Sequence, residues 1–133
     1  MHQISSKLWV GSDADFAQLD QFGTEWAIVH AAKTWHKKVC GYTTNAAPQG
    51  AEYLTAVRGK RIALNMIDAA AAMFNKGMID AGLAFIDEQL PLLKDADQVL
   101  IHCNQGQSRA PTLGMLYIAP TLPEDFEAAE AEY

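Results

Sequence analysis

The sequence predicts an α/β domain in which helices flank a central, mostly parallel β-sheet. Short apolar runs alternate along the chain with longer segments of helical periodicity, which is typical of α/β folds. Several of these runs are apolar at nearly every position, as strands buried on both faces of a parallel sheet are. At 133 residues, 50% of them hydrophobic, the chain can form a real core, so we expect one domain over residues 1–133.

Four short runs have the character of β-strands. They are rich in apolar residues, are bounded by turn-forming residues and are too short for helices. We expect these strands within residues 7–12, 25–32, 60–67 and 98–103. Open α/β sheets bind ligands beyond the carboxyl ends of their strands. The loop that follows residues 98–103 therefore occupies the position expected of a binding site.

Two helices are expected between the strands. Residues 12–23 have Ser12 as an N-cap, two aspartates in the first turn and a glycine after the end. From Phe74 to Leu93, apolar side chains recur at three- and four-residue spacings, with charged residues on another face. Pro91 is expected to kink or end this second helix, because proline cannot continue the helical hydrogen bonds.

Two further helices are expected in the last part of the chain. Residues 110–119 form an apolar helix entered through Pro111, a residue type favoured in the first turn. Thr121 and Glu124 have the spacing of a capping box at the start of a helix over residues 121–133. The apolar stripe of this helix stops in mid-pattern at the last residue, which leaves open whether the chain is a fragment of a longer protein.

Residues 33–50 show no clear period, so we expect a long loop with little regular structure. Loops of this length in small domains are often functional. The Trp-His-Lys-Lys cluster at residues 35–38 either lines an entrance that attracts acidic sequence or forms an ordinary solvated face. Cys40, in the same expected loop, is interpreted as incidental, and His30 and His36 as structural residues.

Composition and charge argue against several classes of function. The net charge is −6, and residues 68–133 carry three basic against eleven acidic residues, which disfavours nucleic-acid binding. No apolar run approaches the roughly 18 residues of a membrane span, and the N-terminus lacks the regions of a signal peptide. Two cysteines are too few for a disulfide scaffold, and the four histidines lack metal-ligand spacing. We expect a cytoplasmic protein without membrane contact and without a metal site.

The segment from Cys103 to Arg109 joins a strand end, a tight polar loop and a helix N-terminus. Backbone N–H groups and the helix dipole at such a place can cradle an anion, and Gly106 permits the sharp turn. Arg109 offers two parallel donors, the geometry that a phosphate prefers. The same positive field favours the ionised, nucleophilic form of a thiol. Cys103 is therefore a candidate nucleophile facing a bound phosphoryl group.

The motif HCNQGQSR at residues 102–109 has the HCxxGxxR spacing of the cysteine-dependent protein tyrosine phosphatases. Ser108 and the apolar helix after the arginine make the chain most similar to the small dual-specificity branch. The order of strands and helices and the chain length extend this resemblance over most of residues 4–133. It implies a single phosphatase-like catalytic domain with a dual-specificity-phosphatase-like fold. The usual last helix of that fold is not found after Tyr133, which leaves open whether the fold is truncated at this helix.

The resemblance implies a hydrolase that acts in two steps on phosphotyrosine, and also on phosphoserine or phosphothreonine, in a phosphorylated protein or peptide. Cys103 attacks phosphorus and forms a cysteinyl-phosphate, which water then hydrolyses, while Arg109 holds the phosphoryl group. Asp68 lies 35 positions before Cys103, directly after an expected strand, and is implied to protonate the leaving group. The family needs no cofactor and no metal.

The implied phosphate-binding loop comprises His102, Asn104, Gln105, Gly106, Gln107, Ser108 and Arg109. His102 is expected to orient the cysteine backbone and to tune the thiolate, without transferring protons itself. The chain departs from the family pattern at Ala110, where Ser or Thr usually follows the arginine and stabilises the departing thiolate. This departure predicts slower hydrolysis of the phospho-enzyme. Gln105 is bulkier than the usual residue and is expected to crowd the pocket floor.

Two other functions remain open on the sequence. Rhodanese-like sulfurtransferases also place a loop cysteine after a strand, and would carry a persulfide without using Asp68. Ala110 favours a non-catalytic pseudophosphatase that binds phosphorylated residues, whereas the intact Cys103 and Arg109 argue against it. Polyphosphoinositide and 5′-triphosphate substrates are less favoured, because Asn104, Gln105 and Gln107 are neutral.

Overall fold

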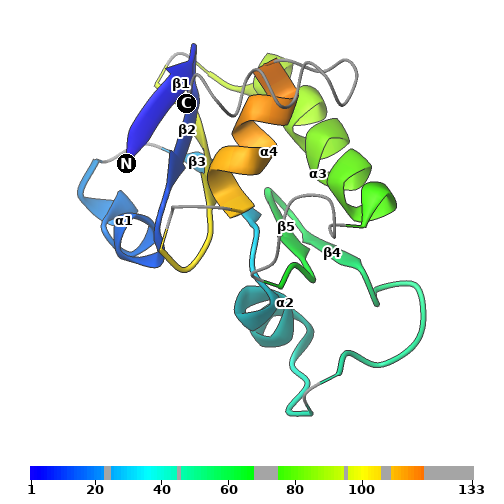
Figure 1. The fold of residues 1–133 in the computed structure, drawn as a ribbon. Coiled ribbons are helices and arrows are strands. Elements are labelled where there is room, and N and C mark those ends of the chain that lie inside the picture. The colour runs from blue at the N-terminus through cyan, green and yellow to red at the C-terminus, as the bar shows by residue number, and fades with distance from the viewer. Residues whose placement is uncertain (23–24, 45, 68–74, 95, 106–108, 119–133) are drawn as a thin grey trace.

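The computed structural model describes residues 1–22, 25–44, 46–67, 75–94, 96–105 and 109–118, and these form an α/β fold with a mixed six-stranded sheet flanked by helices (Figure 1). The strands are β1 (His2–Ser5), β2 (Leu8–Gly11), β3 (Trp26–His30), β4 (Thr55–Arg58), β5 (Arg61–Leu64) and β6 (Gln98–His102). The helices are α1 (Asp13–Ala17), α2 (Lys33–Cys40), α3 (Lys76–Gln89) and α4 (Arg109–Ile118).

The sheet has the strand order β1-β2-β6-β3-β5-β4. The four central strands, β2, β6, β3 and β5, are mutually parallel, whereas β1 and β4 pair antiparallel at the two edges. The predicted α/β class with a parallel centre is thus confirmed. The likeness to one particular phosphatase branch stays a prediction at this level.

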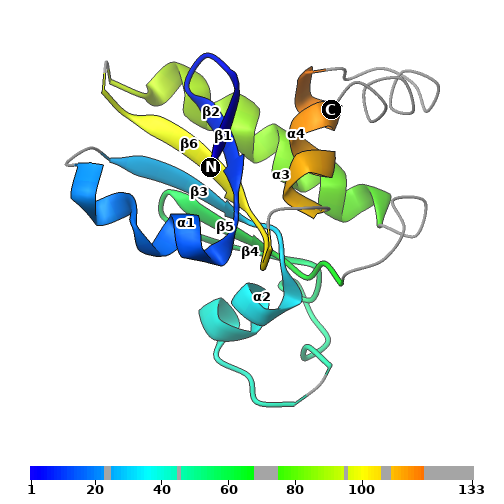
Figure 2. The same cartoon turned by 60° about the vertical axis from the view of Figure 1, so that its left-hand side comes forward.

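Helices cover both faces of the sheet: α1 and α2 lie on one face, and α3 and α4 on the other (Figure 2). Side chains alternate along β6 between these faces. Val99, Ile101 and Cys103 belong to the larger buried cluster with α3 and α4, whereas Leu100 belongs to a smaller cluster on the other side. The alternation continues at the end of the strand, so the side chains of Cys103 and its neighbour His102 lie on opposite faces of the sheet.

All four predicted strands are present, as β2, β3, β5 and β6, but two edge strands were not predicted. The strands β1 and β4 are short, polar at several positions and antiparallel, with a burial pattern that leaves much of each exposed. Edge strands need only one hydrogen-bonded neighbour, so their sequences carry a weaker apolar signal. Their pairing depends on contacts with β2 and β5, not on their own composition.

The prediction of a loop over residues 33–50 is wrong for its first half, because residues 33–40 form α2. Ala32 at the N-cap makes no side-chain hydrogen bond, and His36 is the buried residue of the helix, so neither a cap nor an apolar stripe marks it. Gly41 ends the helix in the left-handed conformation, with φ 80°. The cluster at residues 35–38 therefore lies on a helix.

The other helices agree with prediction to within a turn or two. In α1, Ser12 is the N-cap as predicted and completes a capping box with Asp15, but the α-helix ends at Ala17 and continues as a 3₁₀ turn over Leu19–Phe22. In α3, Asn75 is the N-cap, and the chain passes into a 3₁₀ turn over Leu90–Leu92, so Pro91 ends the helix.

The helix expected over residues 121–133 lies outside the described residues. Within those residues, no helix is both long and apolar enough to cross a membrane.

Candidate active site

The candidate site lies at the edge of the sheet where the parallel strands end. The chain crosses from β2 to β3 and leaves between them a gap that β6 fills later. The helix that follows β6 lies on the opposite face from those that follow its two neighbours (Figure 2). Such a change of side opens a crevice at the carboxyl ends of the strands, the usual ligand position in open α/β sheets. Cys103 and Arg109 border this point.

Cys103 directly follows β6 and is held by its backbone and by the core. Its backbone N–H donates to the carbonyl oxygen of Gly11 at 3.2 Å, which ties it to the end of β2. The residue is 2% exposed and packs in the cluster that contains Ala110 and Leu113 of α4. The structure thus places Cys103 as predicted, against the start of α4. Gly106, Gln107 and Ser108, predicted to form the rest of the anion cradle, lie outside the described residues.

Arg109 is the first residue of α4 and is 7% exposed. Its Nη1 donates to the carbonyl oxygen of Met66 at 3.0 Å, and its Nη2 donates to Oδ1 of Asn104 at 2.8 Å. Its Nε is buried and has no hydrogen-bond partner among the described residues. A buried donor without a partner costs about 1–3 kcal/mol. The guanidinium is therefore fixed on two sides and has a donor left for an acceptor that enters the site.

Asp68, the predicted proton donor, lies outside the described residues. The segment that leads to it is described, and it runs beside Arg109. Met66 follows β5, is fully buried and accepts hydrogen bonds both from Arg109 and from the backbone N–H of Lys33, the latter at 2.8 Å. The chain two residues before Asp68 is thus tied to the arginine of the motif.

Asn104 connects the motif to the helix after β2. Its Nδ2 donates to Oδ2 of Asp13 at 2.9 Å and to Oγ1 of Thr34 at 3.0 Å, and its backbone carbonyl accepts from the N–H of Asp13 at 3.3 Å. Together with the bond to Arg109, these contacts join the starts of α1, α2 and α4. Gln105, the next residue of the motif, is exposed.

His102 lies on the opposite face of the sheet from Cys103, where strand register places it beside His30. Its Nδ1 lies 3.1 Å from Oδ1 of Asp13, and its Nε2 lies 2.7 Å from Nδ1 of His30. The carboxylate can only accept, so Nδ1 of His102 donates to it, and Nε2 accepts from His30. The ring of Phe16 stacks on His102 with 3° between the planes.

Both imidazoles of this pair are neutral at neutral pH. Burial, followed by the neighbouring His102 and Arg61, lowers the pKa of His30 to about 3. Burial also lowers the pKa of His102 to about 4, although Asp13 opposes the shift. The contact of His102 with Asp13 is thus a hydrogen bond to a neutral ring. The expected roles of His102 in orienting the cysteine and tuning the thiolate stay predictions.

Asp13 was not predicted as a site residue, since its place in the sequence indicates an acid in the first turn of a helix. Its carboxylate accepts from three side chains, namely Trp35 Nε1 at 2.8 Å, His102 and Asn104. A signal was present in the sequence: Asp13 comes directly after the strand within 7–12, whose carboxyl end shares an edge with that of the cysteine's strand. Only the register of β2 beside β6 turns this position into a contact.

The cluster at residues 35–38 divides between two environments. Trp35 faces the network and stacks on His30 with 8° between the planes, while Lys38 lies 4.4 Å from the centre of the Trp35 ring. His36 is buried on the far side, bonded to the hydroxyl of Tyr42 and the carbonyl of Glu52, which agrees with its predicted structural role. Cys40 lies at the end of α2, with its sulfur 3.7 Å from His36 Nε2.

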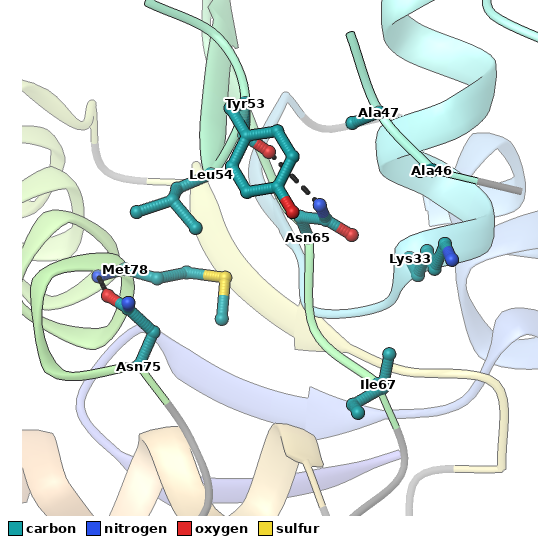
Figure 3. Close-up of a pocket in the computed structure, with 9 residues that line it drawn as sticks. All are labelled: Lys33, Ala46, Ala47, Tyr53, Leu54, Asn65, Ile67, Asn75 and Met78. Carbon is teal, nitrogen blue, oxygen red and sulfur yellow. Dashed lines mark hydrogen bonds between the residues drawn. The ribbon is translucent and has the colours of Figure 1, made fainter. Parts of the chain in front are cut away.

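A pocket of about 270 Å³ opens beside this edge of the sheet (Figure 3). The starts of α2 and α3 stand on its two sides, and the segment after β5 crosses between them. Lys33 is the one charged side chain in its lining among the described residues. The backbone N–H of Lys33, a lining residue, and the guanidinium of Arg109 both donate to the carbonyl of Met66, which connects the lining of the pocket to Arg109. Its lining residues are Lys33, Ala46, Ala47, Tyr53, Leu54, Asn65, Ile67, Asn75 and Met78.

The described residues include no group of three or more His, Cys, Asp or Glu that could hold a metal ion. The chain matches no known protein-family model and no curated protein. The resemblance to cysteine-dependent phosphatases therefore depends on residues 102–109 and on the order of the elements around them.

Proposed function

We propose that this protein hydrolyses phosphomonoesters, phosphotyrosine first and phosphoserine or phosphothreonine second, in a phosphorylated protein or peptide. The observation that carries the proposal is the state of Arg109. Its guanidinium is buried and anchored at both Nη atoms, and its Nε–H has no partner among the described residues. Beside a cysteine at the carboxyl end of a central parallel strand, such a donor suits an oxyanion.

In the proposed reaction, the sulfur of Cys103 attacks phosphorus, so that an S–P bond forms as the P–O bond to the leaving group breaks. The leaving oxygen takes a proton from Asp68, and Arg109 stabilises the charge on the phosphoryl oxygens. Water then attacks the cysteinyl-phosphate and gives its proton to Asp68. Inorganic phosphate leaves and the thiolate is restored.

The pocket that is connected to Arg109 through the Met66 carbonyl supports a peptide substrate over a small phosphate ester. Its lining combines apolar side chains, such as Leu54 and Met78, with the charged Lys33. Such a surface suits the side chains that flank a phosphorylated residue.

The direct test is hydrolysis of p-nitrophenyl phosphate and of a phosphotyrosine peptide by the wild type and two cysteine variants. Cys103→Ser is expected to abolish turnover but to retain the peptide, because the serine hydroxyl is not ionised at neutral pH. Cys40→Ser is the matched control and is expected to keep wild-type activity, since Cys40 lies at the end of α2, away from the motif. Equal loss in both variants, or undiminished turnover by Cys103→Ser, would contradict the proposal.

Ala110 supports one alternative, a pseudophosphatase that binds phosphorylated residues without turnover. Ala110 is fully buried in the core cluster that also contains Cys103, and this position offers no hydroxyl to assist the departing thiolate. Peptide binding without phosphate release by the wild type would favour this alternative. Transfer of sulfur from thiosulfate to cyanide, without phosphate release, would favour the rhodanese-like function.

A further inference from the structure

We propose that Asp13 is a positioning residue: through Asn104, it holds the Arg109 guanidinium in the orientation that grips an oxyanion. This inference rests on the proposed function, because it assigns Asp13 to the same site. It concerns a residue outside the HCxxGxxR motif, on a different helix, 96 positions before the arginine in the sequence.

The orientation of the Asn104 amide is determined by its hydrogen-bond partners. Its Nδ2 has two acceptors, Asp13 Oδ2 and Thr34 Oγ1, on one side, and its Oδ1 has one donor, Arg109 Nη2, on the other. If the amide were reversed, its NH₂ group would face the guanidinium, and two donors would meet without an acceptor. The amide therefore has one satisfied orientation.

Asp13 is itself held in place by hydrogen bonds. Its Oδ1 accepts from Trp35 Nε1 at 2.8 Å and from His102 Nδ1, which leaves Oδ2 directed at Asn104. An indole N–H can only donate, so the atom of residue 13 that faces Trp35 must be an acceptor oxygen. The backbone bond from Asp13 N to Asn104 O fixes the same two residues a second time.

These contacts determine the orientation of Arg109. With Nη2 bonded to Asn104 and Nη1 to the Met66 carbonyl, the plane of the guanidinium is fixed. Its Nε–H is the buried donor without a partner. A donor held ready before the anion arrives needs no reorganisation on binding. Asp13 thus acts through Asn104 and need not touch the substrate.

Each single exchange between acid and amide, at position 13 or at position 104, should break this chain of bonds. In Asp13→Asn, the new Oδ1 must serve Trp35, so the new NH₂ group faces that of Asn104. In Asn104→Asp, two carboxylates meet where one bond stood. Each loss involves a charge-assisted hydrogen bond, and is expected to weaken binding of tungstate, an unreactive oxyanion, by about tenfold or more.

The double exchange, Asp13→Asn with Asn104→Asp, should restore the chain of bonds with its direction preserved. Asn at position 13 accepts from Trp35 and donates to Asp at position 104, which accepts from Arg109. Thr34 can turn its hydroxyl to donate. The size of every side chain is kept, so tungstate affinity is expected to return to within about threefold of the wild type. A role in folding alone would not produce this recovery.

The measurement is the dissociation constant of tungstate by calorimetry for the wild type, both single variants and the double variant, with kcat and KM for p-nitrophenyl phosphate alongside. Asp15→Asn is the matched control: the same exchange on the same helix, at a carboxylate bonded to Ser12 and the N-terminus. It should lower the melting temperature yet leave tungstate binding unchanged.

The possible results distinguish a failure of the role of Asp13 from a failure of the proposed function. Wild-type affinity in both single variants, a double variant as weak as the weaker single one, or an equal loss in Asp15→Asn would overturn the role of Asp13 alone. A wild-type protein that neither binds tungstate nor releases phosphate would overturn the proposed function, and this inference with it.

Discussion

The proposed role of Asp68 as proton donor can be tested by comparing substrates whose leaving groups differ in their need for a proton. Asp68→Asn keeps the size of the side chain and removes the acid, so the rate with phenyl phosphate, a poor leaving group, should fall by about 10²–10⁴-fold. The rate with p-nitrophenyl phosphate should fall far less, because that phenolate leaves without a proton. Asp80→Asn, on the exposed face of α3 beside Lys76, is the control. Equal losses on both substrates would remove Asp68 from the acid role.

Ala110 carries the second residue-level prediction, which concerns the later step of the reaction. A serine at this position would supply the hydroxyl that stabilises the departing thiolate in the cysteine-dependent phosphatases that the motif resembles. Ala110→Ser should therefore speed hydrolysis of the cysteinyl-phosphate, seen in rapid-mixing experiments as a smaller initial burst of p-nitrophenol and a faster steady state. An unchanged burst and steady state would show that this step does not limit turnover.

At the scale of the elements, the close approach of α4 to the sheet requires a glycine at position 114. A Cβ at Gly114 would lie 2.5 Å from Ile4 Cδ1 and 2.9 Å from Val10 Cγ1. The end of Ile4 can rotate away, but the β-branched Val10 is stiff. Gly114→Ala should therefore lower the free energy of unfolding by about 1–3 kcal/mol in urea titrations.

The same exchange should also weaken tungstate binding, because Arg109 begins α4 and would move with it. Gly77→Ala, on the exposed first turn of α3, is the control and should change stability by no more than about 1 kcal/mol. If Gly114→Ala were as stable as the wild type, the close approach of α4 to β1 and β2 would not be a constraint.

The sequence predicted elements where a local pattern identifies them, and failed where contacts between elements decide. Ser12 was recognisable as an N-cap because its side chain and the first turn of α1 are neighbours in the chain. The helix α2 was missed because its buried face carries His36, whose partners Tyr42 and Glu52 lie in the following loop. A histidine contributes no apolar periodicity, so its burial is visible only once the loop is folded over it.

At the scale of the whole molecule, the same limit applies to the site. The motif at residues 102–109 was predictable because its spacing is local, and the structure places Cys103, Asn104 and Arg109 together. The contribution of Asp13 was not, since it reaches the motif only when β2 pairs with β6. The pairing of His30 with His102 likewise arises from the register between β3 and β6, two strands separated by about half of the chain.

That buried imidazole pair makes the stability of the whole fold depend on pH. In the unfolded chain both rings titrate near pH 6.5, whereas burial holds the pKa of His30 at about 3 and that of His102 at about 4. Below about pH 6.5 the unfolded state therefore binds protons that the folded state does not. The free energy of unfolding should fall as the pH falls toward 4, by up to about 1.4 kcal/mol per pH unit for each imidazole.

Urea titrations at pH 7.5, 6 and 5 test this dependence above the range in which the carboxylates titrate. His36, whose pKa burial also lowers, adds to the slope in the same direction. His30→Gln removes one titrating ring and should reduce the loss of stability between pH 7.5 and 5 relative to the wild type, whatever its effect at pH 7.5. The prediction follows from the burial of the pair between β3, β6, Phe16 and Trp35. A wild-type stability that stays constant from pH 7.5 to 5 would contradict it.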